Sequence, residues 1–338
     1  MIDVFVVGGG PAGLAAAIAV RRRGMDVTVA DCSEKPIDKA CGEGIMPDGV
    51  AAAAALGIPL EQTGGFAFSG IRFVSGELSV EAKFPSGVGL GVRRTTLHSL
   101  MADRAAQAGV RIEWGTRVNP GCLQLARWVV GADGGNSVVR AWSGLDASVR
   151  HSRRFGFRRH YRLAPWTEFM EIHWGQGCQI YITPVDASEI CAVLISPDRR
   201  LRLDDALPQF PELERRLARA SVADAERGGV SATHRLCRVT RGNVALVGDA
   251  SGSVDAITGE GLCLLFQQAE ALAAALEQGD LAAYEGAHRR LGRRPELMAD
   301  LMLMLDRRTR LRRFTMRAFS ASPGLFARLL AFHVGVTS

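Results

Sequence analysis

The stretch DVFVVGGGPAGLAAAIAVRRRGMDVTVAD, residues 3–31, decides the fold. Its apolar residues 3–7 predict a short buried strand, and the small helix-forming residues 12–23 predict a helix that Gly24 ends. A second strand is expected over residues 27–30. Strand, glycine turn, helix and strand in this order predict the βαβ unit that opens a parallel sheet.

Three glycines at the turn, Gly8, Gly10 and Gly13, form the pattern G-x-G-x-x-G between strand and helix. The first permits a tight turn, the second lets a pyrophosphate approach the backbone, and the third permits close helix packing. Asp31 lies 18 residues after Gly13, where a carboxylate can accept hydrogen bonds from both ribose hydroxyls. An acid there disfavours a 2′-phosphate, so the pattern predicts FAD or NAD rather than NADP.

The composition narrows the class of protein. The 338 residues, 47% of them hydrophobic, suffice for one large or two closely packed domains. The net charge of +6 comes from scattered arginines, so nucleic acid is not an expected partner. The seven cysteines include no C-x-x-C pair, which predicts neither a disulfide framework nor a metal site. With no apolar run of about 18 residues and no basic leader, we expect a cytoplasmic protein.

The rest of the chain predicts a nucleotide-binding part interrupted by a second architecture. Residues 71–84 alternate like a hairpin, and four strand-like stretches between 153 and 196 predict a largely antiparallel sheet. The buried strand in GNVALVGD, 242–249, then resumes the first part. The expected division is a split nucleotide-binding domain at 1–70, 86–150 and 235–290, a substrate domain at 71–85 and 151–234, and C-terminal helices at 291–338.

Two later stretches point to a family. VVGADGGNSVVR, 129–140, and VALVGDASGSVDAITGEGL, 244–262, each end an apolar strand in Gly-x-Asp or Gly-Asp. With the glycine fingerprint and an arginine before a helix, Arg93, they follow the order seen in flavoproteins of the p-hydroxybenzoate hydroxylase and geranylgeranyl reductase superfamily. The chain resembles that superfamily over nearly its whole length, and the matching positions are Asp133, Gly134, Ser137, Arg140, Gly248 and Asp249.

The resemblance implies an α/β fold: a Rossmann-type FAD-binding domain of the p-hydroxybenzoate hydroxylase kind, an inserted mainly antiparallel β-sheet substrate domain, and a helical C-terminus. It implies FAD bound along its length, with Asp249 at the ribityl chain or pyrophosphate and a helix opening at 259–262 towards the flavin N1/O2 edge. The residues expected to bind FAD are Gly8, Gly10, Pro11, Ala12, Gly13, Asp31, Cys41, Gly42, Arg93, Val118, Asp249, Gly259, Gly261 and Leu262.

Departures from the family patterns separate its branches. TGEGL, 258–262, and ACGEG, 40–44, look like the reductase and halogenase branches. Halogenation is disfavoured because the Trp-x-Trp-x-Ile-Pro stretch is missing and no lysine lies between Lys39 and Lys83. The Tyr-x-Trp-x-Phe-Pro stretch of geranylgeranyl reductases is matched by QIYITPV, 179–185, which keeps Tyr181 and Pro184 but loses the aromatic pair.

Three functions stay open at this point. The favoured one is an FAD-dependent monooxygenase that hydroxylates an aromatic or polyketide-like molecule, with electrons from NAD(P)H or a partner reductase. The alternative is an FAD-dependent reductase or dehydrogenase of a hydrophobic substrate, and a minor one is a non-catalytic flavin-binding protein. The basic, apolar C-terminal helices are compatible with peripheral membrane contact, although ordinary packing is favoured, and the oligomeric state is open.

The loop DKACGEGIMPDGV, 38–50, supplies the candidate catalytic residues. Gly42 and Gly44 predict backbone pressed against a planar ring, with Cys41 as a small wall and Glu43 as a structural group or a proton relay. Cys41 has no metal ligand at suitable spacing and no nearby histidine in the sequence, so a nucleophilic role is disfavoured. Tyr181 is the third candidate, and a further group expected to include substrate contacts is His160, Tyr161, His173 and Trp174.

Overall fold

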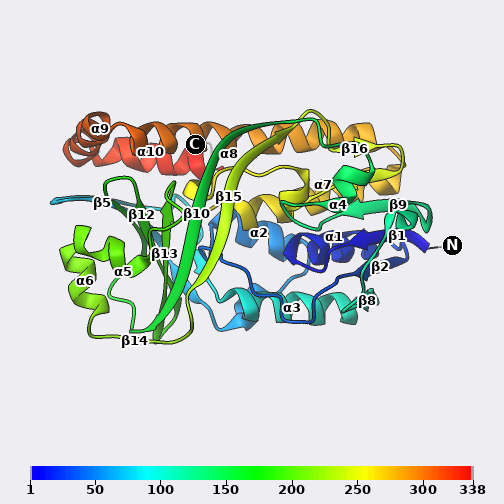
Figure 1. Cartoon of the computed structure of the whole chain (residues 1–338), viewed down its shortest axis with the longest axis horizontal. Helices are drawn as coiled ribbons and strands as arrows, with labels where there is room; N and C mark the ends of the chain where they lie inside the picture. The colour runs from blue at the N-terminus through cyan, green and yellow to red at the C-terminus, as the bar shows by residue number, and fades with distance from the viewer. Residues whose placement is uncertain (1, 336–338) are drawn as a thin grey trace.

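The computed structural model describes the main chain of residues 2–335, and their side chains apart from 148–152. Its nucleotide-binding sheet has the strand order β16-β17-β9-β1-β2-β8, parallel except for the β16–β17 pair (Figure 1). The chain leaves this sheet after β9 and returns to it at β17. The strands are β1 (Ile2–Val7), β2 (Val27–Ala30), β8 (Arg111–Glu113), β9 (Ala126–Gly131), β16 (Thr240–Arg241) and β17 (Val244–Leu246).

Helix α1 (Pro11–Arg21) sits in the centre of this domain and contacts both α3 (Arg94–Gln107) and α7 (Gly261–Gln278). Its alanine-rich sequence is buried almost throughout, because small side chains let three helices and a sheet approach one another closely. Gly13 shows how close the approach is: a Cβ there would lie 1.8 Å from the Gly8 carbonyl oxygen. The glycine at this position is therefore required by packing.

The second sheet has the order β14-β10-β13-β12-β11-β5-β6, with β15 also pairing with β10, and only the β11–β5 pair is parallel. The prediction of a mainly antiparallel inserted sheet is thus confirmed. Its strands are β5 (Gly70–Ser75), β6 (Leu78–Lys83), β10 (Ser148–Arg162), β11 (Phe169–Trp174), β12 (Gln179–Asp186), β13 (Glu189–Ser196), β14 (Ser221–Val222) and β15 (Arg227–Leu236).

Both faces of the central strands of this sheet are buried, which explains their near-continuous apolar sequences. One face carries Ile180, Ile182 and Leu194 and packs against α5 (Leu203–Ala206) and α6 (Pro211–Leu217). The opposite face carries Met170 and Ile172 and belongs to the main core. The alternation in FMEIHW therefore decides which side chains point towards the nucleotide-binding domain.

Three helices complete the chain: α8 (Leu281–Arg307), α9 (Thr309–Ala321) and α10 (Pro323–His333). Helix α8 contacts α7, and α9 and α10 both contact β6. Figure 1 shows α8, α9 and α10 along the upper edge of the molecule. Among the described residues, no helix is long and apolar enough to cross a membrane.

The remaining elements connect these parts. A small sheet of β3 (Gly44–Ile45), β7 (Gly89–Gly91) and β4 (Phe66–Phe68) holds the loop that precedes α2 (Pro47–Ala55). Short helices are α4 (Val138–Trp142), η1 (Leu60–Thr63), η2 (Pro120–Gln124), η3 (Leu207–Gln209), η4 (Gly248–Ser251) and η5 (Ala256–Thr258).

Candidate functional site

The glycine fingerprint forms a turn between β1 and α1 that matches a dinucleotide cradle. A Cβ on Gly8 would lie 2.4 Å from the Ala132 carbonyl oxygen, whereas a Cβ on Gly10 would meet nothing within 4 Å. The Asp31 carboxylate accepts hydrogen bonds from Gly9 N at 2.6 Å and Ser33 N at 2.7 Å. Each carboxylate oxygen keeps a further lone pair, so Asp31 can still accept a ribose hydroxyl.

Gly42 and Gly261 share the open surroundings of Gly10: a Cβ on either would meet no atom within 4 Å. Packing within the protein therefore does not require glycine at these three positions, which belong to three separate segments. A flat or charged group that runs close to the backbone would require it. The main-chain N–H groups that open α7 at Gly261 also lack intrahelical partners, so they can donate to such a group. These features fit FAD.

The Gly-Asp motif is joined to the fingerprint. A Cβ on Gly248 would lie 2.5 Å from the Ala12 Cβ, so the two segments meet directly. Asp249 is exposed and pairs with Lys39, at 3.0 Å, from the loop that precedes α2. The carboxylate of Asp249 can therefore turn towards a ligand that lies along α1 without leaving a buried charge unpaired.

The Asp133, Ser137 and Arg140 motif holds the backbone together. Asp133 accepts hydrogen bonds from the Ser137 hydroxyl at 2.5 Å and from Val138 N at 2.7 Å. Arg140 is buried and donates to the main-chain carbonyl of Ala250 at 3.2 Å, beside the Gly-Asp motif. This motif fixes the position of η4.

Glu43 lies in a buried network that joins the loop to the second sheet. Its Oε2 is 2.6 Å from His160 Nε2, and its Oε1 accepts hydrogen bonds from Arg94 N at 2.9 Å and Arg158 Nη1 at 3.1 Å. His160 Nδ1 is 2.9 Å from Asp224 Oδ2. These contacts hold Glu43, which is 1% exposed, at a φ of 59° that residues other than glycine rarely adopt.

Arginines balance the charge of this network. Arg158 makes a two-pronged contact with Asp38, at 2.8 and 3.1 Å. Burial opposes ionisation of Asp38, but the hydrogen bonds and charge of Arg158 outweigh it and lower the pKa of this carboxyl. Arg93, expected at the FAD, pairs with Glu189 at 2.7 Å and Asp224 at 2.9 Å. The network lines a charged cavity open to solvent beside the loop.

The other candidates from the sequence have defined places. Cys41 Sγ lies 3.4 Å from Glu43 N, and half-buried Val118 follows β8. Tyr181 is buried, and its hydroxyl donates to the Ile257 carbonyl at 2.6 Å. Catalytic and FAD-binding roles for these residues stay predictions. Among the residues of the second sheet, Trp174 packs in the main core, and Tyr161 packs on the face that carries α5 and α6. His173 pairs with Glu171.

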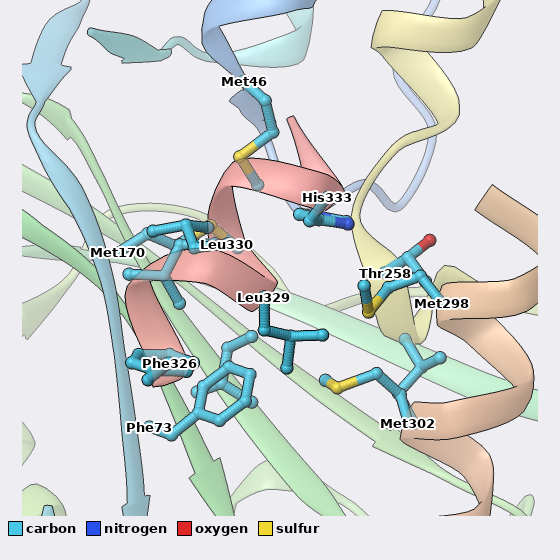
Figure 2. A pocket seen from close by; sticks show the side chains of 13 residues that line it. Met46, Phe73, Met170, Thr258, Met298, Met302, Phe326, Leu329, Leu330 and His333 are labelled. Carbon is cyan, nitrogen blue, oxygen red and sulfur yellow. The ribbon is translucent and has the colours of Figure 1, made fainter. Parts of the chain in front are cut away.

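An apolar pocket, which Met46 at the end of this loop helps to line, lies between the second sheet and the C-terminal helices (Figure 2). All but two of its lining side chains are apolar, the exceptions being Thr258 and His333. The lining comes from six segments: Met46 before α2; Ile71 and Phe73 of β5; Met170 and Ile172 of β11; Ile257 and Thr258 of η5; Met298 and Met302 of α8; and Phe326, Leu329, Leu330 and His333 of α10.

A buried acid adjoins the polar end of the pocket. Glu260 occupies the N-cap position of α7, but its side chain makes no capping hydrogen bond. Its Oε2 has no hydrogen-bond partner among the described residues, and its Oε1 is 3.6 Å from His333 Nδ1. Burial raises the pKa of Glu260 to about 8, against the attraction of Arg294 and with the repulsion of Asp48. Burial, with the nearby charge of Arg294, lowers the pKa of His333 to about 4. Both side chains are therefore mainly uncharged at neutral pH.

Sequence reasoning missed Arg158, Asp224, Glu260 and His333. Glu260 carried a signal, because it lies between two glycines in a motif already placed at the flavin. The other three carried none, since they become neighbours of the site only through sheet register and helix docking.

The sequence and the fold are similar to those of known flavoproteins. Residues 1–121 match the FAD binding domain family. The chain is 27% identical to a menaquinone reductase of Mycolicibacterium smegmatis, over 84% of this chain and 78% of that protein. It is also 27% identical to digeranylgeranylglycerophospholipid reductase 1 of Methanothermobacter thermautotrophicus, over 86% of this chain and 80% of that protein. The flavin-dependent brominase Bmp2 superposes with a TM-score of 0.83 at 19% identity, covering 99% of this chain and 93% of that one.

The fold, the cradle and these similarities agree. The chain is an FAD-dependent oxidoreductase whose residues 1–121 match the FAD binding domain family, and the proteins it resembles include reductases, hydroxylases and a halogenase.

Proposed function

We propose that this protein is an FAD-dependent reductase of a hydrophobic, isoprenoid-bearing substrate. The observation that carries the proposal is the apolar pocket beside the loop of residues 38–50, which is expected to touch the flavin. Thr258 and His333 are the polar residues of its lining. A polar aromatic acid would lose its hydration there and could regain hydrogen bonds only at the end where Thr258 and His333 lie, and each group left unpaired costs free energy. An apolar chain would not incur this cost.

The shape-adaptable lining supports the same substrate class. Met46, Met170, Met298 and Met302 all face the pocket. Methionine is unbranched and polarisable, so it packs around irregular apolar groups. The sequence similarity to a menaquinone reductase and to a digeranylgeranylglycerophospholipid reductase favours this function over hydroxylation, which the sequence alone had favoured.

FAD, when bound, supplies the hydride of such a reduction. A proton must also reach the substrate, and Glu260 is a buried acid, protonated at neutral pH, at the edge of the pocket. His333 Nδ1 lies 3.6 Å from Glu260 Oε1, so a small side-chain rotation would bring the two within hydrogen-bond reach. The apolar side chains around them keep bulk water away from the reacting atoms.

Anaerobic turnover tests the proposal. Purified FAD-loaded protein is reduced with NADPH, NADH or dithionite without oxygen and is then mixed with a short-chain menaquinone or a geranylgeranyl lipid. We expect flavin reoxidation and a product that has gained two hydrogen atoms. No flavin reoxidation by either substrate would contradict the proposal. The same series identifies the electron donor, NAD(P)H or a partner reductase.

Hydroxylation is the second candidate, and the Glu43–His160–Asp224 chain favours it. Linked groups of this kind can carry a proton from a buried phenol to solvent. A product that gains one oxygen atom, formed only in air, would establish this function in place of the reductase.

A further inference from the structure

The C-terminal helices present an unusual surface. From residue 307 to the end of the sequence there are seven arginines and neither aspartate nor glutamate. Only Arg312 among the seven is buried. We call the exposed side of α9 and α10 the arginine face; its members are Arg310, Arg313, Phe314 and Arg317 of α9 and Leu325, Arg328 and Phe332 of α10.

Helical spacing gathers these side chains on one side of each helix. Positions 310, 313, 314 and 317 form one stripe along α9, whereas Arg312, Met316 and Phe319 form the buried stripe opposite. On α10 the exposed positions 325, 328 and 332 form a stripe in the same way. Both helices pack on β6, so their outer stripes turn away from the sheet.

Two features distinguish this face from an ordinary charged surface. Many arginines elsewhere in the described chain pair with carboxylates, as Arg23 does with Glu270 and Glu277. The five exposed groups nearest α9, at 307, 308, 310, 313 and 317, have no ion pair with any described residue. Phe314 lies among them with 71% of its surface exposed, and Phe332 is 41% exposed. Unpaired cations around exposed aromatic groups match the headgroup region of an anionic bilayer.

The position of the face connects it with the pocket. Helix α10 forms both: Phe326, Leu330 and His333 line the pocket from its inner side (Figure 2), and Leu325 and Phe332 lie on its outer side. The α10 part of the arginine face therefore lies one helix away from the pocket. A protein resting on lipid through this face would hold its pocket next to the phase in which an apolar substrate dissolves.

We propose that the arginine face docks the protein on anionic lipid membranes and presents the apolar pocket to the bilayer. The pocket part of this inference rests on the proposed function, whereas the docking itself does not. The guanidinium groups would contact lipid phosphates, and Phe314 would insert at the boundary with the acyl chains.

Vesicle sedimentation tests the docking with the FAD-loaded full chain. We expect the protein to bind vesicles containing phosphatidylglycerol, to bind pure phosphatidylcholine far more weakly, and to dissociate as salt rises from about 0.05 to about 0.5 M. The triple variant R310Q/R313Q/R317Q should partition about 100-fold more weakly, since each basic group near the surface contributes roughly one factor of five. Phe314→Ser should weaken the binding that remains at high salt.

A matched triple variant, R199Q/R200Q/R219Q, removes three exposed arginines from another surface and should bind like the wild type. Equal binding of the two triple variants, or no binding of the wild type to phosphatidylglycerol, would overturn the proposal. A change in oligomeric state in R310Q/R313Q/R317Q without a change in vesicle binding would assign the face to a second copy of the chain instead. Turnover of detergent-dispersed substrate by this variant should equal that of the wild type, so a failed reductase function and failed docking give different results.

Discussion

Glu260→Gln replaces a buried acid by a neutral group of nearly the same shape, and its effect on stability should depend on pH. The pKa of Glu260 is raised from 4.5 to about 8, because burial disfavours the carboxylate. Between these values the folded protein holds a proton that the unfolded chain has released. The wild type therefore loses about 1.4 kcal/mol of unfolding free energy for each pH unit through this window.

The glutamine variant has no such proton to lose. At pH 5 the two proteins should have nearly the same stability, and at pH 9 the variant should be more stable by roughly 2 to 5 kcal/mol. The pKa of His333 is lowered to about 4, so between pH 4 and its ordinary value of 6.5 this residue makes the free energy of unfolding rise with pH. Because this contribution is present in both proteins, it cancels in the difference between them. Asp48, Arg294 and Cys263, which also surround Glu260, are unchanged as well.

Urea denaturation followed by circular dichroism at pH 5, 7 and 9, with FAD in excess, measures the difference. Glu214→Gln, on the exposed side of α6, serves as the control and should show no pH-dependent difference from the wild type. If Glu260→Gln differs from the wild type by the same amount at all three pH values, the side chain is ionised in the folded protein. It could not then supply a proton to the pocket at neutral pH.

Three further substitutions separate structure from function. Glu43→Gln should lower the free energy of unfolding in urea by about 2 kcal/mol, because the hydrogen bonds to Arg158 and His160 lose the negative charge of the carboxylate. Unchanged stability, FAD content and turnover would exclude a role of Glu43 as a proton relay. Gly10→Ala should leave the apoprotein stable but weaken FAD binding at least 10-fold in fluorescence titration. Gly13→Ala, whose Cβ would lie 1.8 Å from a carbonyl oxygen, should instead destabilise the fold. If the two variants had equal effects on stability and on FAD binding, Gly10 would not be part of an FAD cradle. Tyr181→Phe loses one hydrogen bond, so it should lower stability by about 1 kcal/mol and leave kcat unchanged, and a large fall in kcat would show a catalytic role.

The fold could be predicted because its signals are local. The strand, turn and helix of residues 3–31 lie within one βαβ unit, and the later strand at Val244–Leu246 has its own apolar run and Gly-Asp ending. Alternation along FMEIHW predicts that Ile172 and His173 lie on opposite faces, as they do. Each of these inferences needs only a few neighbouring residues.

The site could be predicted only in part, because it depends on distant pairs. Glu43 meets His160 across 117 positions, and the contact exists because register places His160 of β10 opposite Cys191 of β13. His333 reaches the pocket only once α10 has docked on the sheet. Periodicity predicts that α10 has an apolar face, but it does not say which pocket this face closes.

The contacts of the loop at residues 41–46 show how the two domains can act together. The Thr183 hydroxyl of β12 donates to the Gly42 carbonyl at 2.8 Å, and His160 of β10 holds Glu43, so the second sheet anchors the loop from two strands. Met46 N contacts Cys263 Sγ at 3.3 Å, which anchors the same loop to the start of α7. A movement of the second sheet would therefore move the loop backbone that is expected to touch the flavin. The contact of the same loop with α7 would resist this movement. A substrate bound in the proposed pocket, which Met46 lines, would in this way be coupled through one short loop to the backbone expected to touch the flavin.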